Sequence, residues 1–304
     1  MFDQLQELLS PIAFTIPIGE NGFPIYWYGI IIAVGIGLGA WWSSREIERR
    51  GYSSDDLFNA LLIAVLSGYL FARIGYVTQD IVLNGATYDS FIDMINIRAG
   101  GVNIIWGFIG ASIVTTWFVR SRKIPFWHYA DMVAPTVFLA QGIGRWGNFI
   151  NQELYGPPTN SPTWGLLIDA HNRIGAYINL TAYPVETTRF HPTFFYESIA
   201  LLLGFVIVVV LTNMYRDNLR PGTLFGFFML WWGGNRAWIE LFRPDQPTLG
   251  NSPITLSMVM AIGIALAGVY VLLLVYDMIP QSERMRRQEL RQKRTPKPKR
   301  QRNS

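Results

Sequence analysis

An arginine, an asparagine and a glutamate stand near the end of an apolar segment. Arg145 and Asn148 are three residues apart in the segment 129–149, and Glu153 follows the point where its helix should end. Side chains three apart share one helical face. An arginine inside a membrane helix costs about 2.5–3.5 kcal/mol to insert, so it should face protein or a polar cavity. A fixed cation beside amide donors at the water boundary suits a phosphate group.

Glycines flank this polar face. Gly142, Gly144 and Gly147 remove side chains beside it, so another helix or a lipid head group can approach the backbone. The alternative is that Arg145 extends its charge to the membrane surface while Asn148 caps or bridges helices. Intramembrane charges are functional hypotheses by default, and both interpretations stay open at this point.

The composition is that of a membrane protein. The chain has 304 residues, of which 50% are hydrophobic and 15% charged, whereas soluble proteins carry about 25% charged residues. The sequence contains no cysteine, which excludes disulfides, thiolate nucleophiles and Cys-ligated metals. His128, His171 and His191 lie too far apart for a metal-ligand spacing. We therefore expect neither a metal nor another cofactor.

Seven segments are long and apolar enough to cross about 30 Å of hydrocarbon. They are residues 26–44, 57–78, 102–119, 129–149, 194–214, 222–242 and 255–276. Residues 1–25 contain no Lys or Arg, so the basic start of a cleavable signal peptide is missing. The sequence predicts an all-α integral membrane protein whose seven transmembrane helices form one domain over residues 1–280.

Lys and Arg are distributed unequally between the connections. Eighteen of the 25 fall on one predicted side, ten of them between Arg284 and Arg302, and four fall on the other. The basic side is cytoplasmic by the positive-inside rule, so the amino terminus should lie outside and the carboxyl terminus inside. We expect the tail 281–304 to be a disordered cytoplasmic extension near anionic lipid, and not a nucleic-acid-binding domain.

This orientation places most embedded polar residues in the outer half of the membrane. They are Tyr28, Arg73, Arg145, Glu197 and Arg236. Asp131 is the exception, at the inner start of its segment, where a carboxylate would be ordinary helix capping. The convergence predicts one polar site that opens outward. A small-molecule transporter would more often place its site near the midplane.

The connection 150–193 is long for a compact protein and contains Gly-Pro-Pro and Asn-Ser-Pro. Connections of that length are usually functional. We expect a periplasmic lid or substrate-docking region between the fourth and fifth transmembrane helices.

A separate Gly-x-Gly-x-Gly pattern at Gly35, Gly37 and Gly39 lies inside a predicted helix with no preceding strand, so it indicates close helix packing and not nucleotide binding.

Two stretches carry a family resemblance. Gly-Arg-Trp-Gly-Asn-Phe-Ile-Asn-Gln-Glu-Leu-Tyr-Gly at 144–156 resembles the signature of the bacterial prolipoprotein diacylglyceryl transferases. Arg236, Glu240 and Arg243, followed by Pro-Asp, are similar to that family's Arg-x-x-x-Glu-x-x-Arg motif. Their spacing predicts one shared helical face and an ion pair between Arg236 and Glu240. Trp232 stands where relatives often have Tyr.

Shorter matches extend the resemblance. Trp-Tyr-Gly at 27–29, Gly-Tyr-Leu-Phe-Ala-Arg-Ile-Gly-Tyr at 68–76 and His-Pro-Thr-Phe-Phe-Tyr-Glu at 191–197 are similar to family motifs. We expect Pro192 in the first helical turn of the next segment, with Glu197 near the helix start, where the helix dipole favours a carboxylate. Residues 98–107 depart from the family, because relatives typically have Gly-Gly, a few residues and then His-Gly, whereas this chain has Trp106 before Gly107. Tryptophan cannot take a proton, so if that His is a general base, this chain uses another group or has lost the step.

The resemblance implies a reaction. The family transfers a diacylglyceryl group from phosphatidylglycerol to the lipobox Cys thiol of a prolipoprotein signal peptide and releases glycerol phosphate, at the outer side of the bacterial inner membrane. It implies catalytic roles for Arg145, Arg236, Tyr28 and His191. The residues expected to bind substrate are Arg73, Gly100, Gly101, Trp106, Asn148, Asn151, Glu153, Gly156, Glu197, Glu240 and Arg243.

Two questions stay open from the sequence. His191, Glu197 and Tyr28 are all candidates for deprotonating the thiol. The alternative function is a non-catalytic membrane protein that binds or scrambles phosphatidylglycerol with the same cations.

Overall fold

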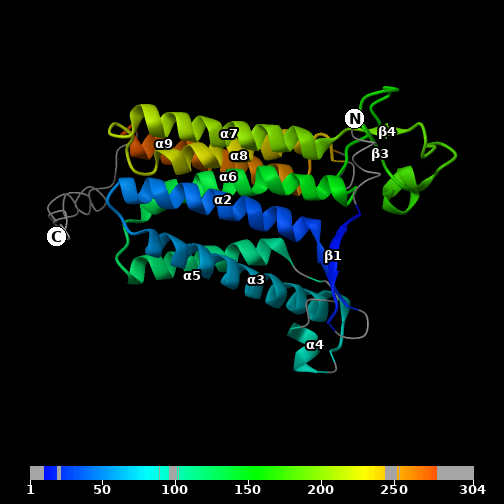
Figure 1. Ribbon diagram of the computed structural model, residues 1–304, viewed down its shortest axis with the longest axis horizontal. Coiled ribbons are helices and arrows are strands. Elements are labelled where there is room, and N and C mark those ends of the chain that lie inside the picture. The colour runs from blue at the N-terminus through cyan, green and yellow to red at the C-terminus, as the bar shows by residue number, and fades with distance from the viewer. Residues whose placement is uncertain are drawn as a thin grey trace. The chain divides into compact units, whose positions relative to one another are not determined.

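The computed structural model is mostly helical (Figure 1). It describes residues 10–18, 22–88, 90–95, 101, 103–243, 252 and 254–278. Its helices are α2 (Trp27–Arg49), α3 (Ser54–Asn84), α4 (Phe91–Ile95), α5 (Ile104–Ser121), α6 (Phe126–Ile150), α7 (Thr193–Tyr215), α8 (Thr223–Glu240) and α9 (Leu256–Val275). Each predicted membrane segment coincides with one of these helices. Gly100 and the predicted tail 281–304 lie outside the described residues.

Four of these helices, α2, α3, α7 and α9, are long and apolar enough to cross a membrane. The polar side chains singled out in the sequence, Arg145, Asn148, Arg236 and Glu240, lie on α6 and α8. The chain is therefore mostly helical with several candidate membrane spans. The finer expectation of seven crossings stays a prediction.

The residues at the helix ends explain where two of these helices begin or stop. The Asp56 N–H donates to Ser53 Oγ at 3.3 Å, which caps the start of α3, and Gly85 ends that helix in the left-handed region at φ 66°. At the start of α9 the Met258 N–H donates to Thr255 Oγ1 at 3.0 Å. A polar cap thus stands immediately before each of these apolar helices.

The chain divides into two compact units. The first contains residues 1–153 and 198–205, and the second contains residues 154–197 and 206–304. The division runs through α7, whose central turns belong with the first unit. There the Ser198 hydroxyl donates to the Gly142 carbonyl of α6 at 2.7 Å. The single domain predicted for residues 1–280 stays a prediction.

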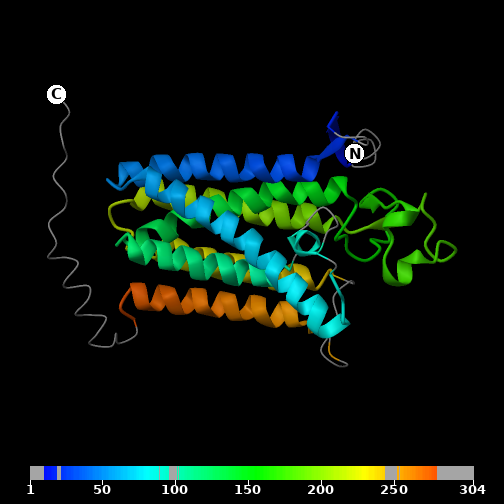
Figure 2. The same cartoon turned by 90° about the horizontal axis from the view of Figure 1, so that it is seen from below.

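In the first unit α2 packs along α6, and α3 packs against α5 (Figures 1 and 2). A Cβ atom on Gly35 would lie 2.8 Å from Ala140 Cα, and one on Gly39 would lie 2.6 Å from Thr136 Cα. The two backbones meet so closely that only glycine fits on α2. The packing role predicted for Gly35 and Gly39 is confirmed, whereas Gly37 faces open space.

A β-hairpin precedes α2 in the first unit and was not expected from the sequence. Strand β1 (Ile12–Ile16) pairs antiparallel with β2 (Phe23–Tyr26), and Ile16 lies opposite Phe23. Tyr26 is both the last residue of β2 and the N-cap of α2. The hairpin therefore fixes the chain directly before Tyr28.

In the second unit α8 packs against α9. The connection predicted as a loop over 150–193 has a small fold of its own. Strands β3 (Leu166–Leu167) and β4 (Arg189–Phe190) pair antiparallel, with the short 3₁₀ helices η1 (Ala170–Asn172) and η2 (Gly175–Ile178) between them. Tyr155, Ile168 and Phe190 are buried, and the Arg173 guanidinium lies 4.4 Å above the Phe190 ring. Two-residue strands leave no periodic pattern in a sequence, which is why they were missed.

Candidate functional site

Arg145, Asn148 and Glu153 form a connected polar group in the first unit. Arg145 Nη1 donates to Asn148 Oδ1 at 3.3 Å, and Asn148 Nδ2 donates to Glu153 Oε1 at 2.7 Å. Asn151 Nδ2 reaches the same carboxylate oxygen at 3.4 Å. Asn148 is only 3% exposed. The amide therefore fixes the cation on one side and the carboxylate on the other, as expected for neighbours on one helical face.

The end of α6 places Glu153 in this group. The helix stops at Ile150, and Gln152 adopts the left-handed region at φ 52°. A left-handed residue just after a helix turns the chain back over its last turn. The Glu153 N–H then donates to the Asn148 carbonyl at 3.0 Å, which holds the carboxylate beside the Asn148 side chain.

Tyr28 lies against α6 at the same level. A Cβ atom on Gly147 would lie 2.0 Å from Tyr28 Cδ2. The ring therefore occupies the space that a side chain at position 147 would fill, between Arg145 and Asn148 in the sequence. Gly147 was expected to let another helix or a lipid head group approach, and the structure places the Tyr28 ring of α2 there.

Arg73 is 7% exposed and donates hydrogen bonds to three main-chain oxygens. Nε donates to Met94 O at 2.6 Å, Nη1 to Gly101 O at 2.8 Å and Nη2 to Asp93 O at 2.9 Å. Arg73, which the sequence predicts to bind substrate, thus clamps the segment between α3 and α5. Gly101, another predicted site residue, is one of the clamped residues.

Trp106 lies in the first turn of α5 against α3. A Cβ atom on Gly75 would lie 2.1 Å from Trp106 Cγ, so the indole fits over a position without a side chain. Its side chain is 45% exposed. Gly101 adopts φ 81°, and a Cβ there would meet the Tyr76 ring at 2.4 Å. Both glycines are required by close packing.

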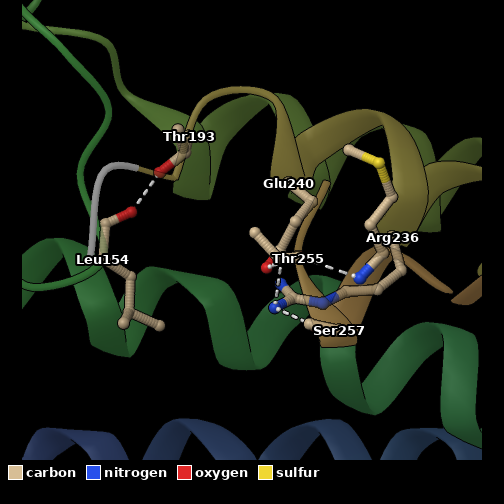
Figure 3. Close-up of polar contacts among 7 residues, drawn as sticks. Leu154, Thr193, Arg236, Glu240, Thr255 and Ser257 are labelled. Carbon is tan, nitrogen blue, oxygen red and sulfur yellow. Dashed lines mark hydrogen bonds and ion pairs between the residues drawn. The ribbon is translucent and has the colours of Figure 1, made fainter. Parts of the chain in front are cut away.

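The second unit holds Arg236 and Glu240 on α8 (Figure 3). Arg236 Nη2 lies 2.8 Å from Glu240 Oε2, which confirms the predicted ion pair. The Thr255 hydroxyl donates to Glu240 Oε1 at 2.9 Å, and Arg236 Nη2 donates to Ser257 Oγ at 3.2 Å. The Glu240 side chain is fully buried and that of Arg236 is 17% exposed.

The prediction that Arg243 shares the helical face of Arg236 and Glu240 is wrong. Helix α8 ends at Glu240, and Arg243 lies in the turn that follows, where its N–H donates to the Glu240 carbonyl at 3.1 Å. Residue 244 is a proline, and the residue before a proline is disfavoured in the α-helical region. The Arg243 side chain therefore does not lie on the helical face of Arg236 and Glu240 that its spacing predicts.

His191 lies beside the rings of Tyr196 and Phe242 in the second unit. Its Nδ1 is 3.1 Å from the Tyr196 hydroxyl, which also accepts from Trp164 Nε1 at 3.1 Å. Burial lowers the pKa of His191 below its ordinary value. The Gly156 N–H donates to the His191 carbonyl at 2.9 Å. Gly156 therefore holds the backbone of the candidate base, and its expected role in binding substrate stays a prediction.

Further bonds close the connection between α6 and α7. The Thr193 hydroxyl donates to the Leu154 carbonyl (Figure 3). Pro192 is the N-cap of α7 and not a residue of its first turn, so that detail of the sequence prediction is wrong. The Thr193–Leu154 bond and the Gly156–His191 bond tie the two ends of the connection to each other inside the second unit.

Two carboxylates lie deeper in their helices than capping requires. Asp131 is 1% exposed and is the sixth residue of α6, whose N-cap is Pro125. Glu197 is the fifth residue of α7, which has no acidic residue in its first turn. The capping interpretation of Asp131 is therefore wrong, and the dipole at the helix start does not account for Glu197, because the dipole acts mainly within the first turn.

The structure distributes the predicted site residues over its two units. Tyr28, Arg145, Asn148, Asn151 and Glu153 lie in one unit, and Gly156, His191, Arg236 and Glu240 lie in the other. Within the described ranges, no group of three His, Asp or Glu side chains is arranged to hold a metal ion.

Sequence reasoning missed Tyr196, Thr255 and Ser257 as partners of these residues. Thr255 carried a usable signal, since a threonine directly before an apolar run indicates a helix N-cap. The contact between a residue of α9 and Arg236 carried none, because the two are far apart in sequence.

Comparison with known proteins gives consistent matches. A family model described as prolipoprotein diacylglyceryl transferase matches residues 11–274. The phosphatidylglycerol–prolipoprotein diacylglyceryl transferase of Bacillus cereus strain G9842 is 40% identical over 248 residues, which cover 81% of this chain and 86% of the relative. The protein of the same name from Bacillus mycoides strain KBAB4 is 39% identical over 248 residues, with the same coverage.

Proposed function

Because this chain belongs to the prolipoprotein diacylglyceryl transferase family, we propose that it transfers the diacylglyceryl group of phosphatidylglycerol to a prolipoprotein. The acceptor is the lipobox Cys thiol of a signal peptide. The observation that carries this proposal is the family match over residues 11–274 together with relatives of that name at 40% identity over 81% of the chain.

The proposed step forms one bond and breaks one. The Cys sulfur attacks the glycerol carbon that carries the phosphate, and a C–S bond forms. The C–O bond to the phosphate breaks, and its electron pair leaves with glycerol phosphate. The thiol proton passes to a base and finally to the released phosphate or to water, so that atoms and charge balance.

Charge develops on the leaving phosphate in this step, which sets the demand on the protein. Arg145 and Arg236 supply positive charge for the phosphate oxygen that is released from carbon. Preorganised donors in a site that excludes water stabilise such developing charge. Each guanidinium already has a fixed neighbour, Asn148 for Arg145 and Glu240 for Arg236. A held cation loses less entropy on meeting the phosphate than one that is free to rotate.

His191 is one of the three candidate bases, with Glu197 and Tyr28 as the others. Its lowered pKa keeps the imidazole neutral near pH 7. Tyr196 receives an indole N–H from Trp164 and has its own proton left to donate to His191 Nδ1. That bond would leave Nε2 protonated, so Nε2 becomes the base only if the tautomer reverses. His191→Gln tests the assignment, and full activity would remove His191 as the base.

The membrane arrangement belongs to the same proposal. The chain crosses the bacterial inner membrane seven times, with its amino terminus outside, its carboxyl terminus in the cytoplasm and the connection 150–193 covering a site that opens to the outer leaflet. Since the chain has no cysteine, single cysteines at Ala182 and Lys123 provide a direct test. A membrane-impermeant maleimide should label position 182 and not position 123 in intact cells, and the opposite pattern would refute this topology.

The activity itself is tested with a lipobox peptide. Purified protein in phosphatidylglycerol-containing detergent micelles should add one diacylglyceryl mass to the peptide, and a peptide with Cys replaced by Ala should gain nothing. Trp106, at the place where relatives carry a histidine, favours one second candidate, a protein that binds phosphatidylglycerol without chemistry. Bound phosphatidylglycerol without any peptide mass gain would support that candidate.

A further inference from the structure

Two hydroxyl groups at the start of α9 contact the Arg236–Glu240 pair of α8 (Figure 3). Thr255 donates to Glu240 Oε1 at 2.9 Å, while Arg236 occupies the other carboxylate oxygen, Oε2, at 2.8 Å. Ser257 accepts from Arg236 Nη2 at 3.2 Å. All four residues belong to the second unit.

The arrangement fixes the orientation of the guanidinium. An ion pair through one nitrogen and one oxygen leaves both side chains free to rotate about the contact. Here the Thr255 hydroxyl holds the second carboxylate oxygen, so the carboxylate cannot turn without losing a bond. Ser257 gives Nη2 a second acceptor on a different helix. The cation is thereby held from two directions.

The protons of these hydroxyls are already assigned by their neighbours. A threonine hydroxyl has one proton and two lone pairs. Thr255 gives its proton to Glu240 and uses a lone pair for the Met258 N–H at 3.0 Å, which caps α9. One side chain thus starts the helix and orients the carboxylate. The two duties can be separated by substitution, because a helix can begin at a residue that offers Glu240 no donor.

We infer that Thr255 and Ser257 are positioning residues that orient Arg236 for the leaving phosphate. This inference rests on the proposed function, since it gives Arg236 the phosphate as its target. Neither hydroxyl touches the substrate in this scheme. They act through the guanidinium and through Glu240, and their removal lowers the rate of the chemical step while the helices stay packed.

Ser257→Ala is the first test. A displacement of about 1 Å at a reacting centre can lower a rate about 100-fold, so loss of this acceptor for the guanidinium should lower kcat for the lipobox peptide by about 10- to 100-fold. The KM for phosphatidylglycerol and the Tm in detergent should stay near those of the wild type, and Ser257→Thr should restore kcat because it keeps the hydroxyl. Ser67→Ala is the matched control. Ser67 is also a helical serine, and its hydroxyl donates within its own helix to the Ile63 carbonyl at 2.5 Å, so kcat should not change.

Thr255 gives a second, independent test. Glycine caps a helix about as well as threonine does, but it has no hydroxyl to donate to Glu240. Thr255→Gly should therefore lower kcat with little change in the Tm, while Thr255→Ser should keep both. A merely structural role predicts instead that kcat falls only as far as the Tm falls.

The outcomes separate this inference from the proposed function. Wild-type kcat in both Ser257→Ala and Thr255→Gly, in a protein where Arg236→Ala abolishes transfer, overturns the positioning role alone. A fall in Tm that accounts for the fall in kcat also overturns it, because the hydroxyls then serve packing. Absence of transfer by the wild-type protein, or full transfer by Arg236→Ala, instead refutes the proposed reaction or the proposed role of Arg236.

Discussion

Gly147→Ala adds a single methyl group and should strongly lower the transfer activity of the protein. The new Cβ would lie 2.0 Å from Tyr28 Cδ2, whereas carbon atoms in contact prefer about 3.5–4.0 Å. The Tyr28 ring, or α2 with it, must therefore move by about 1.5 Å. Both residues lie in the first unit, beside the Arg145–Asn148 contact.

The size of the effect follows from that displacement. A misplacement of about 1 Å at a reacting centre can lower the rate about 100-fold, so kcat/KM should fall by at least about that factor. Overpacking costs about 1–3 kcal/mol in stability, and replacing a helical glycine by alanine returns about 1 kcal/mol. Activity should therefore fall far more than stability does.

The assay compares peptide lipidation rates and Tm values in detergent for two variants. Gly144→Ala is the matched control, since it lies three residues away on the same helix and its Cβ would meet Ile32 Cγ1 at an ordinary 3.4 Å. It should retain activity. The reasoning is refuted if Gly147→Ala is as active as Gly144→Ala, because the Tyr28 ring then either yields freely or is not required.

Three further perturbations are expected to give defined results. Arg145→Ala and Arg236→Ala should each abolish transfer while the purified protein keeps its helical circular dichroism, and normal activity in either would remove that arginine from the phosphate role. Arg73→Ala should lower the Tm strongly, because three bonds to main-chain oxygens are lost together, each contributing about 1.5–3 kcal/mol; an unchanged Tm would contradict the clamp. Burial lowers the folded pKa of His191, so below about pH 6.5 the unfolded chain binds the proton more readily. The His191 contribution to stability should therefore fall as the pH drops from about 6.5 through the folded pKa, and the Tm of His191→Gln should decline less over that window than the Tm of the wild type.

Local patterns in the sequence predicted most of the helices. Each of the seven predicted segments coincides with a helix, because a long apolar run bounded by polar or turn residues has few other structures available. Spacing of three or four residues also predicted the contacts of Arg145 with Asn148 and of Arg236 with Glu240. Both pairs lie within one helix, where sequence distance sets spatial distance.

Contacts between segments that are distant along the chain could not be predicted from the sequence. Nothing at Arg73 indicates that its partners are the carbonyls of Asp93, Met94 and Gly101, since every residue has a carbonyl. Ser257 reaches Arg236 only because α9 packs against α8.

The shared role of Arg145 and Arg236 at the leaving phosphate is implied by the family resemblance and stays a prediction.

The most direct test of the proposed transfer is its stoichiometry. Phosphatidylglycerol labelled in its terminal glycerol would be incubated with the purified protein and a lipobox peptide, and both products would be counted over time. The account predicts one labelled glycerol phosphate for each peptide that gains a diacylglyceryl group, and neither product when the peptide lacks its Cys. Glycerol phosphate released without the Cys would indicate a phospholipase, and bound phosphatidylglycerol with no product would indicate a binding protein; either result contradicts the account.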